Sequence, residues 1–307
     1  MSKSSDITPI GATLYFLPIQ TRVPLKFGTE TLTSVTCARV TLRVKDRLGR
    51  EADGWGETPL SVQWVWPSAV SYETRHQALK DFCVQLMRAW TVFDSWGHAM
   101  EVGHDFQREE LTRLFRDFNA SRPDCEPMPW LAALVCCSLF DLALHDAFGV
   151  LHGLPTYQTY HAGYLNRDLA FFLEPAEGSK TSFAGMYPAD FMALKRPDVL
   201  PAWHLVGGKD WLSASEIDGP VPADGYPSLL ADWIQRDGLK CLKVKLRGND
   251  YAWDYARLVA VGRISIELGA NWLSTDYNCT VTEPDYVNEM LDRLMAEHPR
   301  IFGMILY

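Results

Sequence analysis

The sequence predicts an α+β domain followed by a parallel α/β domain. The first half of the chain combines period-two alternation, typical of antiparallel strands, with three long helical patterns. From residue 203 onward, short apolar runs alternate with amphipathic helices, which indicates a parallel sheet with right-handed crossovers. We therefore expect an α+β domain over residues 1–157, an irregular connection or insertion over 158–202, and an α/β domain over 203–307.

Strands come first. Residues 12–20 are rich in β-branched and aromatic side chains, and residues 35–45 alternate polar and apolar types. The turn residues 46–49 then lead into a returning strand at 50–57, so a hairpin or meander is expected. Residues 24–29, with Pro24 and Gly28, predict a mobile loop between the first two strands.

Helices follow at about 72–92, 106–119 and 128–148. The third pattern is the strongest, because an apolar stripe runs along its length. Gly149 is placed where a glycine would end this helix.

The α/β part has a regular order of elements. Strands are expected at 203–207, 240–246, 272–278 and 301–307, and helices at 226–237, 251–268 and 283–298. Gly238, Gly269 and Pro299 follow these helices as stop signals. A closed (β/α)8 barrel takes about 250 residues, so residues 203–307 correspond to about its first half. The chain therefore reads as C-terminally truncated.

Bulk properties exclude several function classes. The chain is 47% hydrophobic and 22% charged, with a formal net charge of −9 and no long run of Lys or Arg, so a nucleic-acid partner is not expected. The N-terminus has no apolar signal region, and no uninterrupted apolar run reaches the roughly 18 residues of a membrane span. Seven cysteines without a C-x-x-C pair indicate free thiols in a reducing compartment. The expected setting is cytoplasmic, without a membrane.

Two strands carry polar pairs at alternating positions. Lys243 and Lys245 share one strand face, as do Asp276 and Asn278. If the strands are neighbours, two ammonium groups meet a carboxylate and an amide, a combination suited to proton transfer beside an oxygen ligand for a hard metal ion. The plainer alternatives are a solvated edge strand for the lysines and a strand-end cap for Asp276.

Four local motifs together resemble one family. They are Gly54-Trp55-Gly56-Glu57, the segment 139–149 followed by Gly153-Leu154-Pro155, Lys243-Val244-Lys245, and Asp276-Tyr277-Asn278. In this order and spacing they resemble the enolase superfamily, in its mandelate racemase/muconate lactonizing enzyme branch. There are departures: His145 stands where the family commonly has Trp, Val150 where it often has Lys, and Cys279 where Gln or Gly is frequent.

The resemblance implies a capping domain, a (β/α)8-type barrel and Mg²⁺-dependent removal of a proton alpha to a carboxylate. The outcome would be racemisation or epimerisation, cycloisomerisation, or dehydration of a small carboxylate substrate. By resemblance, Lys245 is the general base and Lys243 contacts the substrate carboxylate or sits beside Lys245. Asp276 is a metal ligand, and Asn278 hydrogen-bonds nearby.

Substrate contacts are expected from two capping loops, with Lys26, Phe27 and Glu57 as candidates; for Glu57 a structural role that links the domains is the favoured alternative. The remaining metal ligands and second acid/base group would lie beyond Tyr307, so we expect the 307 residues alone to be inactive and to bind Mg²⁺ weakly. One alternative is a catalytically incompetent truncated paralogue that acts at most as a binding module. Another is an unrelated barrel enzyme that forms a Schiff base. Homo-oligomers are common in the family, and the oligomeric state stays open.

Overall fold

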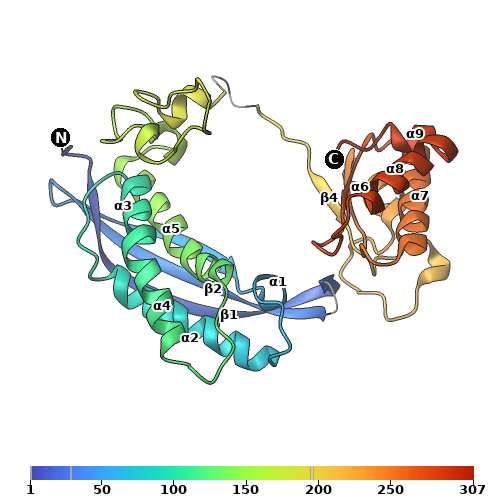
Figure 1. The fold of residues 1–307 in the computed structure, drawn as a ribbon, viewed down its shortest axis with the longest axis horizontal. Helices are drawn as coiled ribbons and strands as arrows, with labels where there is room; N and C mark the ends of the chain where they lie inside the picture. The colour runs from blue at the N-terminus through green and yellow to red at the C-terminus, as the bar shows by residue number, and fades with distance from the viewer. Residues whose placement is uncertain (1, 28–29, 194, 196) are drawn as a thin grey trace. The chain divides into compact units, whose positions relative to one another are not determined.

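The computed structural model describes residues 2–27, 30–193, 195 and 197–307, and it does not describe the side chains at 26, 27 and 30. The chain divides into two compact units (Figure 1). The first comprises Met1–Ile19 and Ser34–Lys195, and the second comprises Gln20–Thr33 and Arg196–Tyr307. The tip of the first hairpin thus groups with the α/β part, which sequence periodicity did not indicate.

An antiparallel meander forms the sheet of the first unit. Its strands are β1 (Ile7–Phe27), β2 (Glu30–Asp46) and β3 (Glu51–Pro59), in that order across the sheet. The turn between β2 and β3 is held by the Asp46 carboxylate, which accepts the backbone N–H groups of Leu48 and Arg50. The predicted hairpin is confirmed, but β1 extends through residues 24–27, where a loop was expected.

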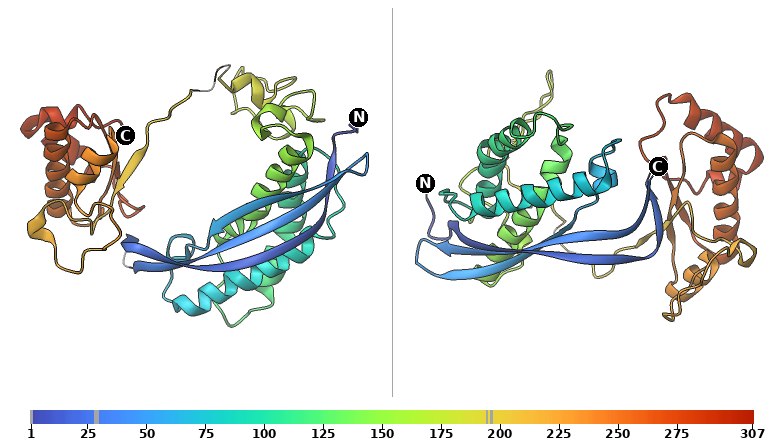
Figure 2. Two further views of the ribbon diagram at one scale, coloured as in Figure 1. Left: turned by 180° about the vertical axis from the view of Figure 1, so that it is seen from behind. Right: turned by 90° about the horizontal axis from the view of Figure 1, so that it is seen from below.

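Helices cover one face of this sheet (Figure 2). They are α1 (Val62–Val65), α2 (Tyr72–Trp90), α3 (Ala99–Phe106), α4 (Thr112–Ala120) and α5 (Trp130–His152). A π-helical turn, Gln107–Leu111, joins α3 to α4, so the pattern at 106–119 spans the end of one helix, this turn and the next helix.

The predicted stop at Gly149 is wrong. Helix α5 continues to His152 and ends at Gly153, whose φ of 65° is the left-handed conformation that glycine adopts readily. Gly149 instead provides space: a Cβ there would lie 2.7 Å from Thr156 Oγ1 and 2.9 Å from the Leu154 carbonyl. Close packing, rather than termination, accounts for this glycine.

Strand β3 packs directly on α5 through two glycines. A Cβ at Gly54 would lie 2.2 Å from the Ala143 carbonyl, and one at Gly56 would lie 1.9 Å from the Leu139 carbonyl. The two glycines of the G-W-G-E motif therefore let the backbone of β3 touch the backbone of α5. Helix α5 is long and apolar enough to cross a membrane, but half of its most apolar window is buried in the first unit, as in a core helix.

Residues 154–193 form an irregular segment with short 3₁₀ turns at Thr156–Thr159, Leu169–Phe171 and Pro188–Phe191. Asn166 ties this segment to the first unit, since its side-chain amide donates to Asp6 and Glu101. The Glu101 carboxylate also accepts the backbone N–H groups of Asn166 and Arg167. The sequence of this segment has little periodicity, and the structure accordingly shows short turns that polar contacts hold in place.

The second unit contains a parallel sheet of β4 (Trp203–Val206), β5 (Cys241–Lys245) and β6 (Trp272–Asp276), in that order. Helices α6 (Leu230–Asp237), α7 (Tyr251–Leu268) and α8 (Asp285–Glu297) pack on one side of this sheet (Figure 1). Gly238 and Gly269 end α6 and α7 in the left-handed conformation, as predicted. The alternation of strand and helix, and the parallel sheet it implies, are confirmed.

The last predicted strand is only partly correct. Pro299 begins a short helix, α9 (Pro299–Phe302), so Ile301 and Phe302 are helical rather than extended. After a turn, residues 304–307 run alongside β6: Leu306 N–H donates to the Leu273 carbonyl at 2.9 Å. Proline at a helix start overrides the β propensity of the apolar run.

Candidate functional site

The two lysines of β5 lie on the face opposite its apolar residues. Leu242 and Val244 are fully buried in the core beneath the helices. Lys243 and Lys245 alternate with them, and their side chains are 42% and 13% exposed. The strand therefore gives Lys245 a sheltered ammonium group and Lys243 a more open one.

Both ammonium groups converge on one carboxylate oxygen. Parallel pairing sets Lys245 opposite Asp276 in the register of β5 and β6. Asp276 Oδ2 lies 2.7 Å from Lys245 Nζ and 2.8 Å from Lys243 Nζ. The predicted juxtaposition of the lysine pair and the acid is therefore present in the structure.

Asn278 completes the cluster through an unusual backbone. Its φ of 54° and that of Cys279, 57°, are left-handed conformations, which non-glycine residues adopt at a cost. This turn lets the Asn278 N–H donate to Asp276 Oδ1 at 2.9 Å and the side-chain oxygen accept from Lys245 Nζ at 2.7 Å. Its side-chain Nδ2 donates to the Leu246 carbonyl at 2.8 Å. Asn278 thus links the ends of β5 and β6.

The charges in this cluster are mutually dependent. Burial by itself raises the pKa of Asp276, but hydrogen bonds from Lys243, Lys245 and the Asn278 N–H outweigh burial and lower the pKa to about 2. Asp276 is therefore ionised at neutral pH.

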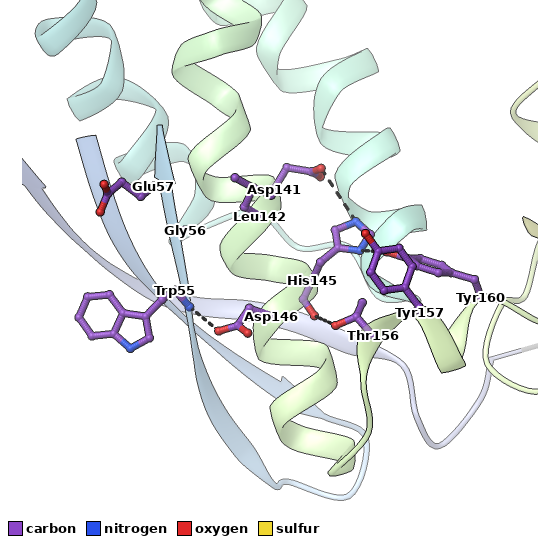
Figure 3. A pocket seen from close by; sticks show the side chains of 10 residues that line it. All are labelled: Trp55, Gly56, Glu57, Asp141, Leu142, His145, Asp146, Thr156, Tyr157 and Tyr160. Atoms are coloured by element: carbon purple, nitrogen blue, oxygen red, sulfur yellow. Dashed lines mark hydrogen bonds and ion pairs between the residues drawn. The ribbon is translucent and has the colours of Figure 1, made fainter. Parts of the chain in front are cut away.

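Glu57, a predicted substrate contact, lies in the first unit. Its carboxylate forms a salt bridge of 2.5 Å with Arg39 on the neighbouring strand. It also lines a pocket of 560 Å³ formed by β3, α5 and residues 156–160 (Figure 3). The salt bridge gives Glu57 a structural role, and its contact with substrate stays a prediction. The side chains of Lys26 and Phe27 lie outside the described part of the structure.

The same pocket holds a hydrogen bond between Tyr160 Oη and His145 Nδ1, 2.7 Å long (Figure 3). Burial raises the pKa of Tyr160 to about 12, so the phenol keeps its proton and donates to the imidazole. His145 therefore ties α5 to the segment that follows it, and this pair does not form an activated nucleophile.

Comparison with known proteins identifies solved structures whose fold is similar to that of this chain. No model of a protein family and no curated protein matches the chain. Among solved structures, the substrate-liganded L-Ala-D/L-Glu epimerase from Bacillus subtilis matches 97% of this chain with a TM-score of 0.54 and 17% identity. The chain therefore shares the fold of this epimerase and of a mandelate racemase/muconate lactonizing protein.

Two further structures agree. A dipeptide epimerase from Enterococcus faecalis, complexed with Mg and the dipeptide L-Leu-L-Tyr, matches 94% of this chain with a TM-score of 0.53 and 13% identity. A mandelate racemase/muconate lactonizing protein from Herpetosiphon aurantiacus matches 96% with a TM-score of 0.50 and 16% identity. The chain spans 60%, 58% and 59% of the lengths of the Bacillus, Enterococcus and Herpetosiphon proteins. It thus shares with these structures an antiparallel sheet covered by helices, followed by parallel β/α units.

The residues described here do not by themselves form a magnesium site. Mg²⁺ prefers six oxygen ligands, and no group of three or more His, Cys, Asp or Glu side chains in the described part of the chain is arranged to hold a metal. Asp276 is the carboxylate in the lysine cluster, and both of its oxygens accept hydrogen bonds. Asp276 can therefore serve as one ligand of such an ion, but it cannot hold the ion alone.

Sequence reasoning missed the residues that support this cluster. Asp254 on α7 accepts hydrogen bonds from the loop after β5, and Tyr286 on α8 donates to Asp254. Both lie on helices, and neither belongs to an alternating polar pair. The only local signal is an acid in an otherwise apolar helix, which is too common to identify a role.

Proposed function

We propose that this chain carries the base-bearing part of a centre that removes a proton alpha to a carboxylate with the help of a divalent metal ion. Racemisation or epimerisation, cycloisomerisation and dehydration are the outcomes open to such a centre. The observation that carries the proposal is the convergence of Lys243 and Lys245 on Asp276 at the ends of adjacent parallel strands. The fold, shared with epimerases, supports it.

Each residue has a role that follows from its surroundings. Lys245 is the base, because it is the more sheltered amine and is aimed by two acceptors, Asp276 and Asn278. It accepts the substrate proton once its own ammonium proton has left. Lys243, 42% exposed, offers a positive charge to the carboxylate of the substrate. Asp276 remains ionised and supplies one oxygen ligand for Mg²⁺, which when bound would stabilise the negative charge of an enolate.

The substrate class we propose is a small carboxylate. Two of the structures with this fold were solved with dipeptides or as dipeptide-type epimerases, so dipeptides form the first set to test and acid sugars the second.

The experiment is exchange of the alpha proton in ²H₂O, followed by ¹H NMR with MgCl₂ in excess. It is performed on the 307-residue chain and on the longest product of its reading frame, with Lys245→Met and Asp276→Asn as variants. We expect exchange in the longer product to need both Mg²⁺ and Lys245, and the 307 residues alone to exchange little because one carboxylate binds Mg²⁺ weakly. Exchange that persists in Lys245→Met would refute the assignment of the base.

The second candidate is a non-catalytic binding module. The observation that favours it is that no group of three or more His, Cys, Asp or Glu side chains within the described ranges could hold a metal ion. Carboxylate binding that depends on Lys243, with no exchange in either polypeptide, would select this alternative. A substrate trapped on Lys245 by borohydride would instead indicate Schiff-base chemistry.

A further inference from the structure

The loop that follows the lysine strand is held by a fully buried carboxylate. Asp254, on the first turn of α7, is 0% exposed. It accepts hydrogen bonds from the backbone N–H of Arg247 at 2.7 Å, the N–H of Gly248 at 2.8 Å and the phenol of Tyr286 at 2.7 Å. These three donors are neutral. None of these hydrogen bonds therefore brings a cation to the buried carboxyl group of Asp254. Burying a carboxylate is costly unless several hydrogen bonds satisfy it.

This loop lies against the loop that bears Asn278. Gly248 has a φ of 75°, and a Cβ at this position would lie 2.9 Å from the Tyr277 carbonyl. The Leu246 N–H donates to the Asp276 carbonyl, and the Leu246 carbonyl accepts from Asn278 Nδ2. A shift of the loop would therefore displace Asn278, one of the two acceptors that aim Lys245.

Tyr286 extends the connection to the next helix. It lies at the start of α8, and its ring packs edge-on against Tyr251 and Tyr277. Burial and the hydrogen bond to Asp254 both raise the pKa of Tyr286, so the phenol keeps its proton and remains a donor. The contacts run without a break from α8 through Tyr286 and Asp254 to the loop after β5.

We infer that Asp254 and Tyr286 are positioning residues that fix the loop after β5 and thereby hold Lys245 against Asp276 and Asn278. They act through the loop and do not touch a substrate. The inference rests on the proposed function only in taking Lys245 as the base, since the arrangement of Lys245 itself can be measured without any activity.

The test is the rate at which Lys245 is acetylated by a limiting amount of an activated ester, measured by peptide mass spectrometry. Lys180, exposed and in the first unit, is the internal reference. Asp254→Asn keeps the shape of the side chain but replaces one acceptor oxygen with a donor, so it cannot satisfy all three partners. We expect this variant to speed acetylation of Lys245 about tenfold relative to Lys180, which corresponds to about 1.4 kcal/mol. The amide proton resonances of Arg247 and Gly248 should also shift.

Tyr286→Phe and Tyr255→Phe form a matched pair. Each removes a phenol–carboxylate hydrogen bond of 2.7 Å between α7 and α8, but Tyr255 donates to Glu297, away from the loop. We expect Tyr286→Phe to speed acetylation of Lys245 about threefold and Tyr255→Phe to leave it unchanged within about 1.5-fold.

Equal acceleration of Lys245 acetylation in both tyrosine variants would overturn the inference, because it would indicate general loosening of the second unit. No acceleration in Tyr286→Phe would also overturn it, because the loop would then not depend on Tyr286. If Asp254→Asn does not fold, the tyrosine pair still decides. A failure here leaves Lys245 as the proposed base, whereas a failure of alpha-proton exchange leaves the acetylation rates unaffected, so the two hypotheses fail separately.

Discussion

Replacing Asp276 with Asn is expected to destabilise the second unit chiefly by leaving two ammonium groups facing each other. Lys243 and Lys245 both contact Asp276 Oδ2, at 2.8 Å and 2.7 Å. The carboxylate is the charge that compensates them. Asn keeps the shape and one acceptor oxygen but removes the negative charge, so the change isolates the electrostatic effect.

The size of this effect follows from the geometry. Because both nitrogens touch one oxygen, they lie at most about 5.5 Å apart, and two unit charges at about 5 Å repel by roughly 3 kcal/mol at an effective dielectric constant of about 20. Lys243 is 42% exposed, so water and salt screen the pair. We therefore expect Asp276→Asn to lower the free energy of unfolding by about 2 kcal/mol, with about 1 kcal/mol recovered when Lys243→Met is added.

The assay is native-state hydrogen exchange of the amides in β5 and β6, since these report the second unit alone. Lys243→Met by itself is the control, and it should cost less than about 0.5 kcal/mol because the side chain is substantially exposed. Added NaCl should stabilise Asp276→Asn more than the natural sequence. If the double variant is no more stable than Asp276→Asn, repulsion between the lysines is not what Asp276 prevents.

Three further predictions concern packing, pH and backbone strain. Gly56→Ala should lower the free energy of unfolding of the first unit by about 3 kcal/mol or more, because a Cβ would lie 1.9 Å from a backbone carbonyl of α5; Gly11→Ala, whose nearest contact would be 3.8 Å away, is the control in urea denaturation. The folded-state pKa of Asp276 is lowered from 3.8 to about 2, so its contribution to stability is present above pH 3.8 and is lost as the pH falls towards 2. Acid titration by circular dichroism should show this loss, and Asp276→Asn should lack it. Cys279 has a φ of 57°, so Cys279→Gly should relieve backbone strain and stabilise the fold by about 0.5–1 kcal/mol. The melting temperature in reducing buffer should therefore rise. An unchanged or lower melting temperature would contradict the expected strain.

Several parts of the site were accessible from local patterns alone. Alternation in a strand has a period of two, so Lys243 and Lys245 share a face whatever surrounds them. The apolar neighbours Leu242 and Val244 then indicate which face is buried. The same reasoning singled out Asp276 and Asn278, but β6 ends at Asp276 and Asn278 lies in a left-handed turn, so its place beside Lys245 comes from that turn and not from strand alternation.

Other features depended on contacts that no local pattern encodes. Gly149 and Gly153 both follow an apolar stripe, and only the approach of the Leu154 carbonyl shows that the first provides space and the second ends the helix. Asp254 is one acid among many until the Arg247 and Gly248 amides are seen to point at it.

The amino-acid sequence by itself determined the order of strands and helices and the polar face of β5, because side-chain alternation and helix periodicity are set by the steric limits of the local backbone. The tertiary structure alone decided that Lys245 lies opposite Asp276 and that a buried Asp254 holds the adjoining loop. Strand register and loop closure are set by packing between residues far apart in the chain, and their free energies are shared among many contacts, so no short stretch of sequence specifies them.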